Sequence, residues 1–163
     1  MSPGSPSRPV AVPPVTWLSP DLGRWLRINH TTDQTTRANY ALLAVQEHLG
    51  DSADGLDVSW AEFVGNHRSS EFEFTVPQGP VTDPYLELQV FDVSAYDHGI
   101  LVNGDALTGF DIPSGAGWQF WMDPITGANL VEGTNTLRFA RDASTGDDFV
   151  IGTVTIHWRE PVE

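Results

Sequence analysis

The chain has 163 residues, 40% of them hydrophobic, including 8 Phe and 6 Trp. This length suits one domain and this apolar content suffices for one core, which excludes a wholly disordered chain. The 8 basic residues stand against 22 acidic ones, giving a formal net charge of −14. So acidic a surface repels nucleic-acid phosphates and anionic lipid headgroups, so we expect no nucleic acid and no membrane as partners.

All 8 basic residues are arginine, and cysteine is absent as well as lysine. Self-repulsion at this charge is screened at about 1 M salt, where the Debye length is about 3 Å, so the composition favours a halophilic source. A GC-rich genome, in which arginine codons replace lysine codons, is the alternative explanation. Without cysteine, disulfides, thiolate zinc sites and cysteine nucleophiles are excluded.

The N-terminal segment is predicted to be an arm outside the domain. Its first fifteen residues hold five prolines and no periodic apolar pattern, which indicates an extended chain. A short helix is predicted next, with a cap, a proline at its first position and an apolar stripe at i, i+3 and i+4. Its markers are Ser19, Pro20, Leu22, Trp25 and Leu26. We therefore assign residues 1–36 to a Pro-rich basic arm with a short helix, and residues 37–163 to a β-sandwich domain.

The net charge changes sign near the boundary between the arm and the domain. Residues 1–37 carry four arginines against two aspartates, a net of +2, which leaves −16 for the rest. The arm could lie on its own body or on an identical neighbour, or it could be a loose leader produced by an over-called start codon. Neither a signal peptide nor an apolar stretch of about 18 residues is visible, so cytoplasmic and virion-associated locations both stay open.

From Ala38 onward the chain reads as short strands. Residues 40–49 fit a helix or an edge strand, and we favour the strand. Apolar and polar residues alternate in 72–76 and again in 85–90, as they do in strands with one solvated face. A strand over 100–102 ends at Asn103-Gly104, a hairpin-type turn, and is expected to resume over 107–112.

Further strands are predicted over 118–122, around Leu137 and Phe139, and over 153–158. In the last of these, Val154, Ile156 and Trp158 face one way, while Thr153, Thr155 and His157 face the other. About eight short strands without helical crossovers predict an all-β, antiparallel two-sheet sandwich.

Four segments carry a more specific resemblance: Ile100 to Gly104, Trp118 to Asp123, Leu130 to Phe139 with its "L..G.NTL" pattern, and Phe149 to Trp158. They resemble the galactose-binding-like jelly rolls found in carbohydrate-binding modules and in accessory domains of glycosidases. The whole chain also resembles small acidic haloarchaeal proteins of unknown function. The resemblance covers roughly residues 38–160 and implies the fold, while no ligand-contacting signature carries over residue by residue.

Aromatic residues near a Gly-rich loop are the candidate ligand-binding site, because sugar rings stack on flat apolar surfaces. Trp118 and Trp121 are the main candidates, with His98 and Asn103 as nearby polar contacts. Trp118 and Trp121 lie on opposite faces of their strand, so one should point outward. The alternative is that Trp118 and Phe120 belong to the core while Trp121 fills a second layer.

The resemblance also implies a structural calcium ion, and no other cofactor is expected. Asp92, Asp97 and Asp105, with His98, are the candidate oxygen-rich ligands around the Asn103-Gly104 turn. A second candidate loop holds Asp142, Asp147 and Asp148. In so acidic a chain, both groupings could equally arise by chance.

The sequence shows no catalytic motif: it lacks G-x-S-x-G, H-E-x-x-H and a phosphate-binding glycine loop, and its five histidines are scattered. We therefore expect no enzyme. Two functions remain, a module that binds carbohydrate or another surface ligand through loops at one end, or a structural part. The structural part would be a virion decoration or tail component, or another homo-oligomeric surface protein, that uses the arm for subunit contacts.

Overall fold

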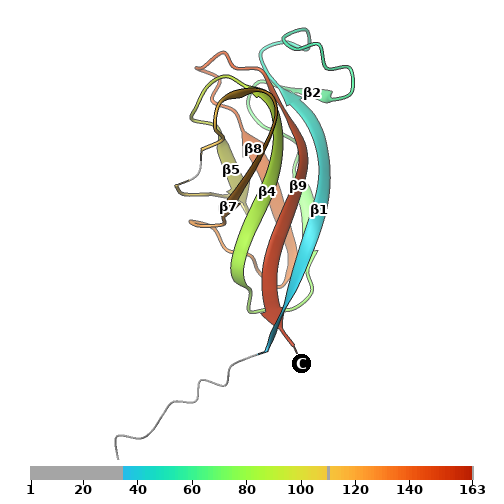
Figure 1. Ribbon diagram of the computed structural model, residues 1–163, viewed down its shortest axis with the longest axis vertical. Coiled ribbons are helices and arrows are strands. Elements are labelled where there is room, and N and C mark those ends of the chain that lie inside the picture. Colours follow the sequence, from blue (N-terminus) through green and yellow to red (C-terminus); the bar gives the residue numbers. More distant parts are fainter. Residues whose placement is uncertain (1–34, 110, 163) are drawn as a thin grey trace, which may run out of the picture. The chain divides into compact units, whose positions relative to one another are not determined.

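A computed structural model describes residues 35–109 and 111–162, and the predicted arm and short helix lie outside these residues. The described chain forms nine strands in two facing sheets and no helix (Figure 1). The five-stranded sheet has the order β2-β1-β9-β4-β7 and the four-stranded sheet the order β3-β8-β5-β6. The strands are β1 (Thr36–Leu49), β2 (Glu62–Gly65), β3 (Phe72–Val76), β4 (Thr82–Val93), β5 (Gly99–Val102), β6 (Asp105–Ala106), β7 (Gly115–Pro124), β8 (Gly133–Ala140) and β9 (Phe149–Pro161). The all-β sandwich is confirmed.

Period-two burial forms the core between the sheets, because alternate side chains of each strand point inward. In β9, Val154, Ile156 and Trp158 are buried, while Thr153, Thr155 and His157 face outward. Because β9 lies between β1 and β4 and pairs antiparallel with both, it supplies the centre of the larger sheet.

One strand pair departs from the expected antiparallel arrangement. β1 and β2 pair in parallel, with Glu47 opposite Glu62 and His48 opposite Phe63. A parallel neighbour needs a long connection, because the chain must return to the same end before it can run alongside. Residues 50–61 are this connection, and β2 itself had no clear signal in the sequence.

The expected strand over 107–112 is wrong. After the Asn103-Gly104 turn, Asp105–Ala106 pair with β5, the Leu107 N–H donates to the Ile100 carbonyl, and the following residues form a loop. Gly109 has a φ of +80°, a conformation that interrupts a strand. Leu107 and Ile112 are buried because they anchor this loop in the core.

Residues 40–49 do form a strand, and it is longer than expected because it begins at Thr36. A bulge at Gln46, whose φ is +52°, shifts the register with β9 and brings Glu47 and His48 to buried positions. Among the described residues, no helix is long and apolar enough to span a membrane.

Candidate functional site

The outer face of the five-stranded sheet, turned away from the core, carries most of the exposed large apolar side chains. β7 contributes three through simple alternation: Trp118 is 53% exposed, Phe120 58% and Met122 62%. β1 adds Tyr40 and Leu42. Large exposed apolar side chains gathered on one face of a folded domain typically mark a binding site. We call this surface the outer face.

At the end where β1 stops, three aromatic rings cluster on the outer face. Trp118 lies opposite Phe91 across the β4–β7 pair, with ring centroids 5.4 Å apart. The loop 50–61 adds Trp60, whose ring lies 5.1 Å from that of Trp118 and 5.7 Å from that of Phe91. Edge-on and tilted contacts of this kind stabilise aromatic groups and fix their orientation.

Gly152 of β9 lies directly beneath the Trp118 ring of this cluster. A Cβ atom at that position would lie 2.7 Å from Cζ3 of Trp118, so the indole ring rests directly on the β9 backbone. Only a residue without a side chain leaves this space. Trp118 is therefore both exposed and held in place.

A second aromatic group lies toward the other end of the outer face. The rings of Tyr85 and His157 stack at 4.5 Å with an interplanar angle of 8°, and Tyr40 lies 6.1 Å from His157. His157 Nε2 is 3.2 Å from Glu87 Oε2, outside hydrogen-bonding alignment. This end therefore combines a flat stacked surface with one carboxylate.

Polar side chains occupy the rows between the two aromatic groups. Strand register places Glu87 between Thr155 of β9 and Met122 of β7, and Gln89 beside Phe120. Phe91 and Tyr85 are six residues apart on β4, a span of about 20 Å at about 3.3 Å per residue. The outer face thus presents two aromatic platforms with hydrogen-bonding groups between them.

Three shallow hollows follow this arrangement. One of about 310 Å³ is lined by Gln89, Trp118, Gln119 and Phe120. The other two flank Tyr85: one of about 540 Å³ is lined mainly by apolar groups including Met122 and Pro124, and one of about 270 Å³ includes Asn39 and His157. Both aromatic platforms therefore border space that a ligand can enter.

The two predicted tryptophans do point to opposite faces. Trp118 is on the outer face, whereas Trp121 packs against the core and donates from Nε1 to Oε1 of Gln119 at 3.2 Å. The alternative that placed Trp118 and Phe120 in the core is wrong, because both are more than half exposed. The structure does not bring the two tryptophans into one surface.

His98 is buried and belongs to a hydrogen-bonded network at the loop end. Its Nδ1 accepts from the Asp142 backbone N–H at 3.2 Å, so its Nε2 carries the proton and donates to Asp147 at 2.8 Å. Asp147 also accepts from the hydroxyl of Ser94 and from the backbone N–H groups of Ser94 and Ala95. The side chain of His98 is fully enclosed, so no ligand reaches it.

The environment of Asp147 keeps its side chain ionised. Burial alone would raise the pKa of this carboxyl, but the hydrogen bonds from His98, Ser94 and Ala95 outweigh burial and lower the pKa below its ordinary value. Asp147 is therefore an ionised structural group that ties the segment 94–98 to the segment 141–148.

Asn103 holds the turn that follows β5. Its Nδ2 donates to the backbone carbonyl of Asn129 and to Oδ1 of Asn135, and its Oδ1 accepts from the N–H of Thr136. With a φ of +53° followed by +85° at Gly104, it forms the predicted hairpin turn. The amide groups of Asn103 are thus engaged within the protein.

The candidate calcium ligands do not converge. Asp92 accepts from the N–H of Gly117, Asp97 donates its own backbone N–H to Asp111, and Asp105 lies exposed in β6. Residues 35–109 and 111–162 contain no group of three or more His, Asp or Glu residues placed to hold a metal ion. The described residues therefore do not fit the oxygen-rich set that calcium takes.

The three aspartates of the second candidate loop are also occupied by contacts within the protein. Asp142 accepts from the N–H of Ser144, which lowers its pKa, and Asp147 is occupied as described. Asp148 Oδ1 lies 3.3 Å from Nε2 of His48, and its carboxylate fills the space beside Gly50 and Gly55, where a Cβ would overlap it. These three aspartates shape the loop end.

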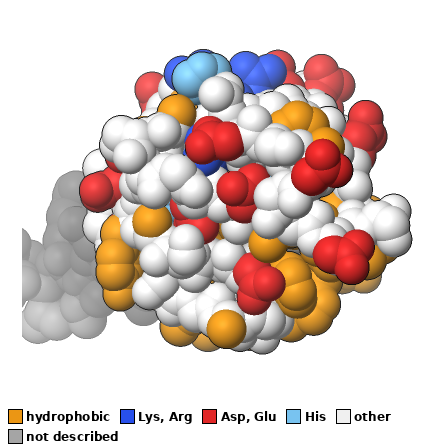
Figure 2. Space-filling model, turned by 90° about the horizontal axis from the view of Figure 1, so that it is seen from above, with side chains coloured by type: hydrophobic (Ala, Val, Ile, Leu, Met, Phe, Trp, Pro, Cys, Tyr) orange, Lys and Arg blue, Asp and Glu red, His pale blue; other side chains and the backbone are white. Residues whose placement is uncertain are grey.

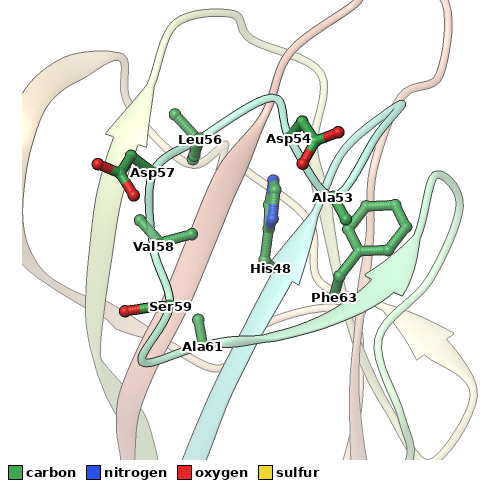
Figure 3. A pocket seen from close by; sticks show the side chains of 9 residues that line it. All are labelled: His48, Ala53, Asp54, Leu56, Asp57, Val58, Ser59, Ala61 and Phe63. Atoms are coloured by element: carbon green, nitrogen blue, oxygen red, sulfur yellow. The ribbon is translucent and has the colours of Figure 1, made fainter.

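A separate pocket of about 370 Å³ opens between the loop 50–61 and the start of β2 (Figure 3). His48 projects into it from β1, opposite Asp54 and Phe63, and its ring meets that of Phe63 at 5.2 Å. Acidic side chains are spread over this end of the sandwich, with apolar ones along one margin (Figure 2). His48 is already paired with Asp148, whereas Asp54, Asp57 and Ser59 present exposed polar side chains at this pocket.

Most of the outer face was missed in the sequence, although a signal was present. Alternation over 153–158 placed His157 outward, and the same alternation over 85–90 put Glu87 and Gln89 there. The pairing of β4 with β9, which stacks Tyr85 on His157, has no local signal. Neither does the loop that carries Trp60 to Trp118.

Comparisons with known proteins give one family match and one solved structure that supports the fold. Residues 37–160 match a family described as "Family of unknown function (DUF7383)". No curated protein matches the chain. Among solved structures, the CBM36-1 domain of a multidomain xylanase from the hindgut metagenome of Trinervitermes trinervoides is similar at 14% identity, with a TM-score of 0.51, over 72% of this chain and 96% of that domain. The GH26-CBM35 β-(1,4)-mannanase of Podospora anserina is similar at 13% identity, with a TM-score of 0.44, over 76% of this chain and 28% of that one.

Proposed function

The chain belongs to the DUF7383 family of unknown function, and we propose that it is a non-catalytic module that binds carbohydrate through the outer face. The observation that carries this proposal is the pair of exposed aromatic platforms with polar side chains between them. Pyranose rings present apolar C–H faces to aromatic side chains and hydroxyls to neighbouring polar groups. In this proposal the ligand binds on the sheet face and not at the loops. Of the ligand-binding residues predicted from the sequence, Trp118 is the one that lies on this face.

Charge favours a neutral, extended glycan. The net charge of −14 disfavours an anionic polysaccharide, and Glu87 on the face adds to this repulsion. The two platforms are separated by about 20 Å along β4, which suits a chain of several sugars better than a single one.

The arrangement also supports a binding role without catalysis. Hydrolysis of a glycosidic bond uses two carboxyl groups on either side of the bond. Between the two aromatic platforms, the described strands present one carboxylate, that of Glu87.

The test is a titration of the protein in molar salt with neutral polysaccharides (xylan, mannan and β-glucan) and with alginate as an anionic probe. Trp118→Ala should weaken binding to the preferred neutral glycan at least about tenfold, because it removes an anchoring aromatic side chain. Tyr96→Ala is the matched control, since Tyr96 is 59% exposed but lies in the β4–β5 connection. Absence of binding to every neutral glycan, or equal affinities of Trp118→Ala and the native chain, would refute the proposal.

A structural role is the second candidate, and the aliphatic part of the outer face favours it. Leu42 and Met122 are both more than 60% exposed and lack the flat faces on which sugars stack. Side chains of this kind suit contact with another protein surface. For the sequence-based version, in which the arm contacts a neighbour, deletion of residues 1–36 should lower the number of chains per particle in solution, and an unchanged oligomeric state would refute it.

A further inference from the structure

β7 is a long edge strand, and beyond an irregularity at Gly117, whose φ is +71°, its residues Trp118 to Met122 lack the usual protection against pairing. The other edge strands are short: β2 has 4 residues, β3 has 5 and β6 has 2, whereas β7 has 10. Native sheets normally keep edges short, charged or covered, because an open edge is a template for another strand. From Gly115 to Met122, β7 contains neither a charged residue nor a proline.

Among the described residues, no backbone hydrogen bond reaches β7 from the side away from β4. Within the described part of the chain, Gly115–Pro124 forms backbone hydrogen bonds with β4 alone. Alternate N–H and C=O groups of a strand point to opposite sides, so half of those in β7 face outward from the sheet edge. These groups can be satisfied by water or by another strand.

We propose that two copies of this chain pair through their β7 edges, antiparallel about a two-fold axis. The sequence of β7 is self-complementary in this arrangement. An axis at Gln119 places Trp118 opposite Phe120 of the other copy, and an axis at Phe120 places Trp118 opposite Met122. Both registers join apolar side chains on the outer face, which is the kind of cross-strand pair that stabilises antiparallel sheets.

The single charged residue of β7 does not oppose this pairing. Asp123 would lie opposite Gly115 with the axis at Gln119 and opposite Gly117 with the axis at Phe120, so no carboxylate meets its own copy. The interface is isologous and closes as a dimer, since each copy uses its one long edge. Side-by-side pairing leaves both outer faces open. Dimer formation therefore does not depend on sugar binding and can be tested without it.

Sedimentation or light scattering without sugar, over a range of protein concentrations in molar salt, measures the pairing. The native chain should form a dimer, and Phe120→Lys should raise the dissociation constant at least about tenfold by placing like charges at the seam. Tyr96→Lys adds the same charge away from the seam and should leave the dimer unchanged. Circular dichroism and the melting temperature show whether each variant folds.

The absence of cysteine makes a second test sharp, because a single introduced cysteine can crosslink only to another copy. Gln119→Cys or Phe120→Cys, whichever lies on the axis, should form a disulfide-linked dimer under mild oxidation, and Tyr96→Cys should not. A native chain that stays monomeric at about millimolar concentration would overturn the proposal. So would a dimer unaffected by Phe120→Lys in which neither β7 cysteine crosslinks faster than Tyr96→Cys.

Discussion

Buried polar side chains at turns and loops are the residues on which the connections of this sandwich depend. Asn135 is fully buried and makes four hydrogen bonds: Nδ2 donates to the carbonyls of Val131 and Gly133, and Oδ1 accepts from the Val131 N–H and from Asn103. Three of these bonds stay within its own loop. The bond to Asn103, 32 residues away, joins two turns and had no local signal.

Asn135→Ala should lower the free energy of unfolding by about 2–3 kcal/mol, because it leaves buried backbone groups without partners. Asn129→Ala is the matched control: Asn129 is exposed, and its contact with Asn103 uses its backbone carbonyl. Urea unfolding of both variants measures the difference. Equal stabilities would mean that the Asn135 network contributes nothing.

The Asp147 network should make the protein sensitive to acid. The pKa of Asp147 is lowered in the folded state, so its stabilising effect is present above the ordinary carboxyl pKa of 3.8 and is lost as pH falls through the folded pKa. The free energy of unfolding should therefore fall below about pH 4, and this fall should be shallower in Asp147→Asn. Asp105→Asn, which changes an exposed aspartate, should keep the native slope.

At the scale of elements, alternation predicted most strands because it reports burial on one face. β3, β4, β7, β8 and β9 follow from it, and residues 40–49 proved to be a strand as favoured. Alternation failed over 107–112, where Leu107 and Ile112 are buried in a loop that turns at Gly109. It also cannot reveal which strands are neighbours, so the β4–β9 pairing that builds the outer face could not be read from the sequence.

The position of each strand predicts its protection from hydrogen exchange. β9 and β4 have a strand on both sides, whereas β2 and β6 are short edges. Exchange should be slowest in β9 and β4 and fastest in β2 and β6, because edge strands open at low cost. Hydrogen exchange followed by mass spectrometry resolves these segments, and equal protection of β2 and β9 would contradict the sheet order.

At the scale of the whole molecule, net charge is the dominant feature. With −14 on 163 residues, self-repulsion opposes the folded state at low ionic strength, and salt screens it. The melting temperature should rise steeply between about 10 mM and about 1 M sodium chloride, where the Debye length falls from about 30 Å to about 3 Å. A melting temperature that is independent of salt would remove the halophilic interpretation of the composition.

Ligand binding at the outer face is tested most directly by a map of backbone amide shifts on titration with the neutral oligosaccharide that binds best. If the outer face is the binding surface, the shifts should extend along it, from Phe91 and Trp118 through Gln89 and Glu87 to Tyr85 and His157. Shifts confined to the pocket around His48 and Asp54, or to the turn at Asn103, would contradict it, since the ligand would then bind at an end of the sandwich.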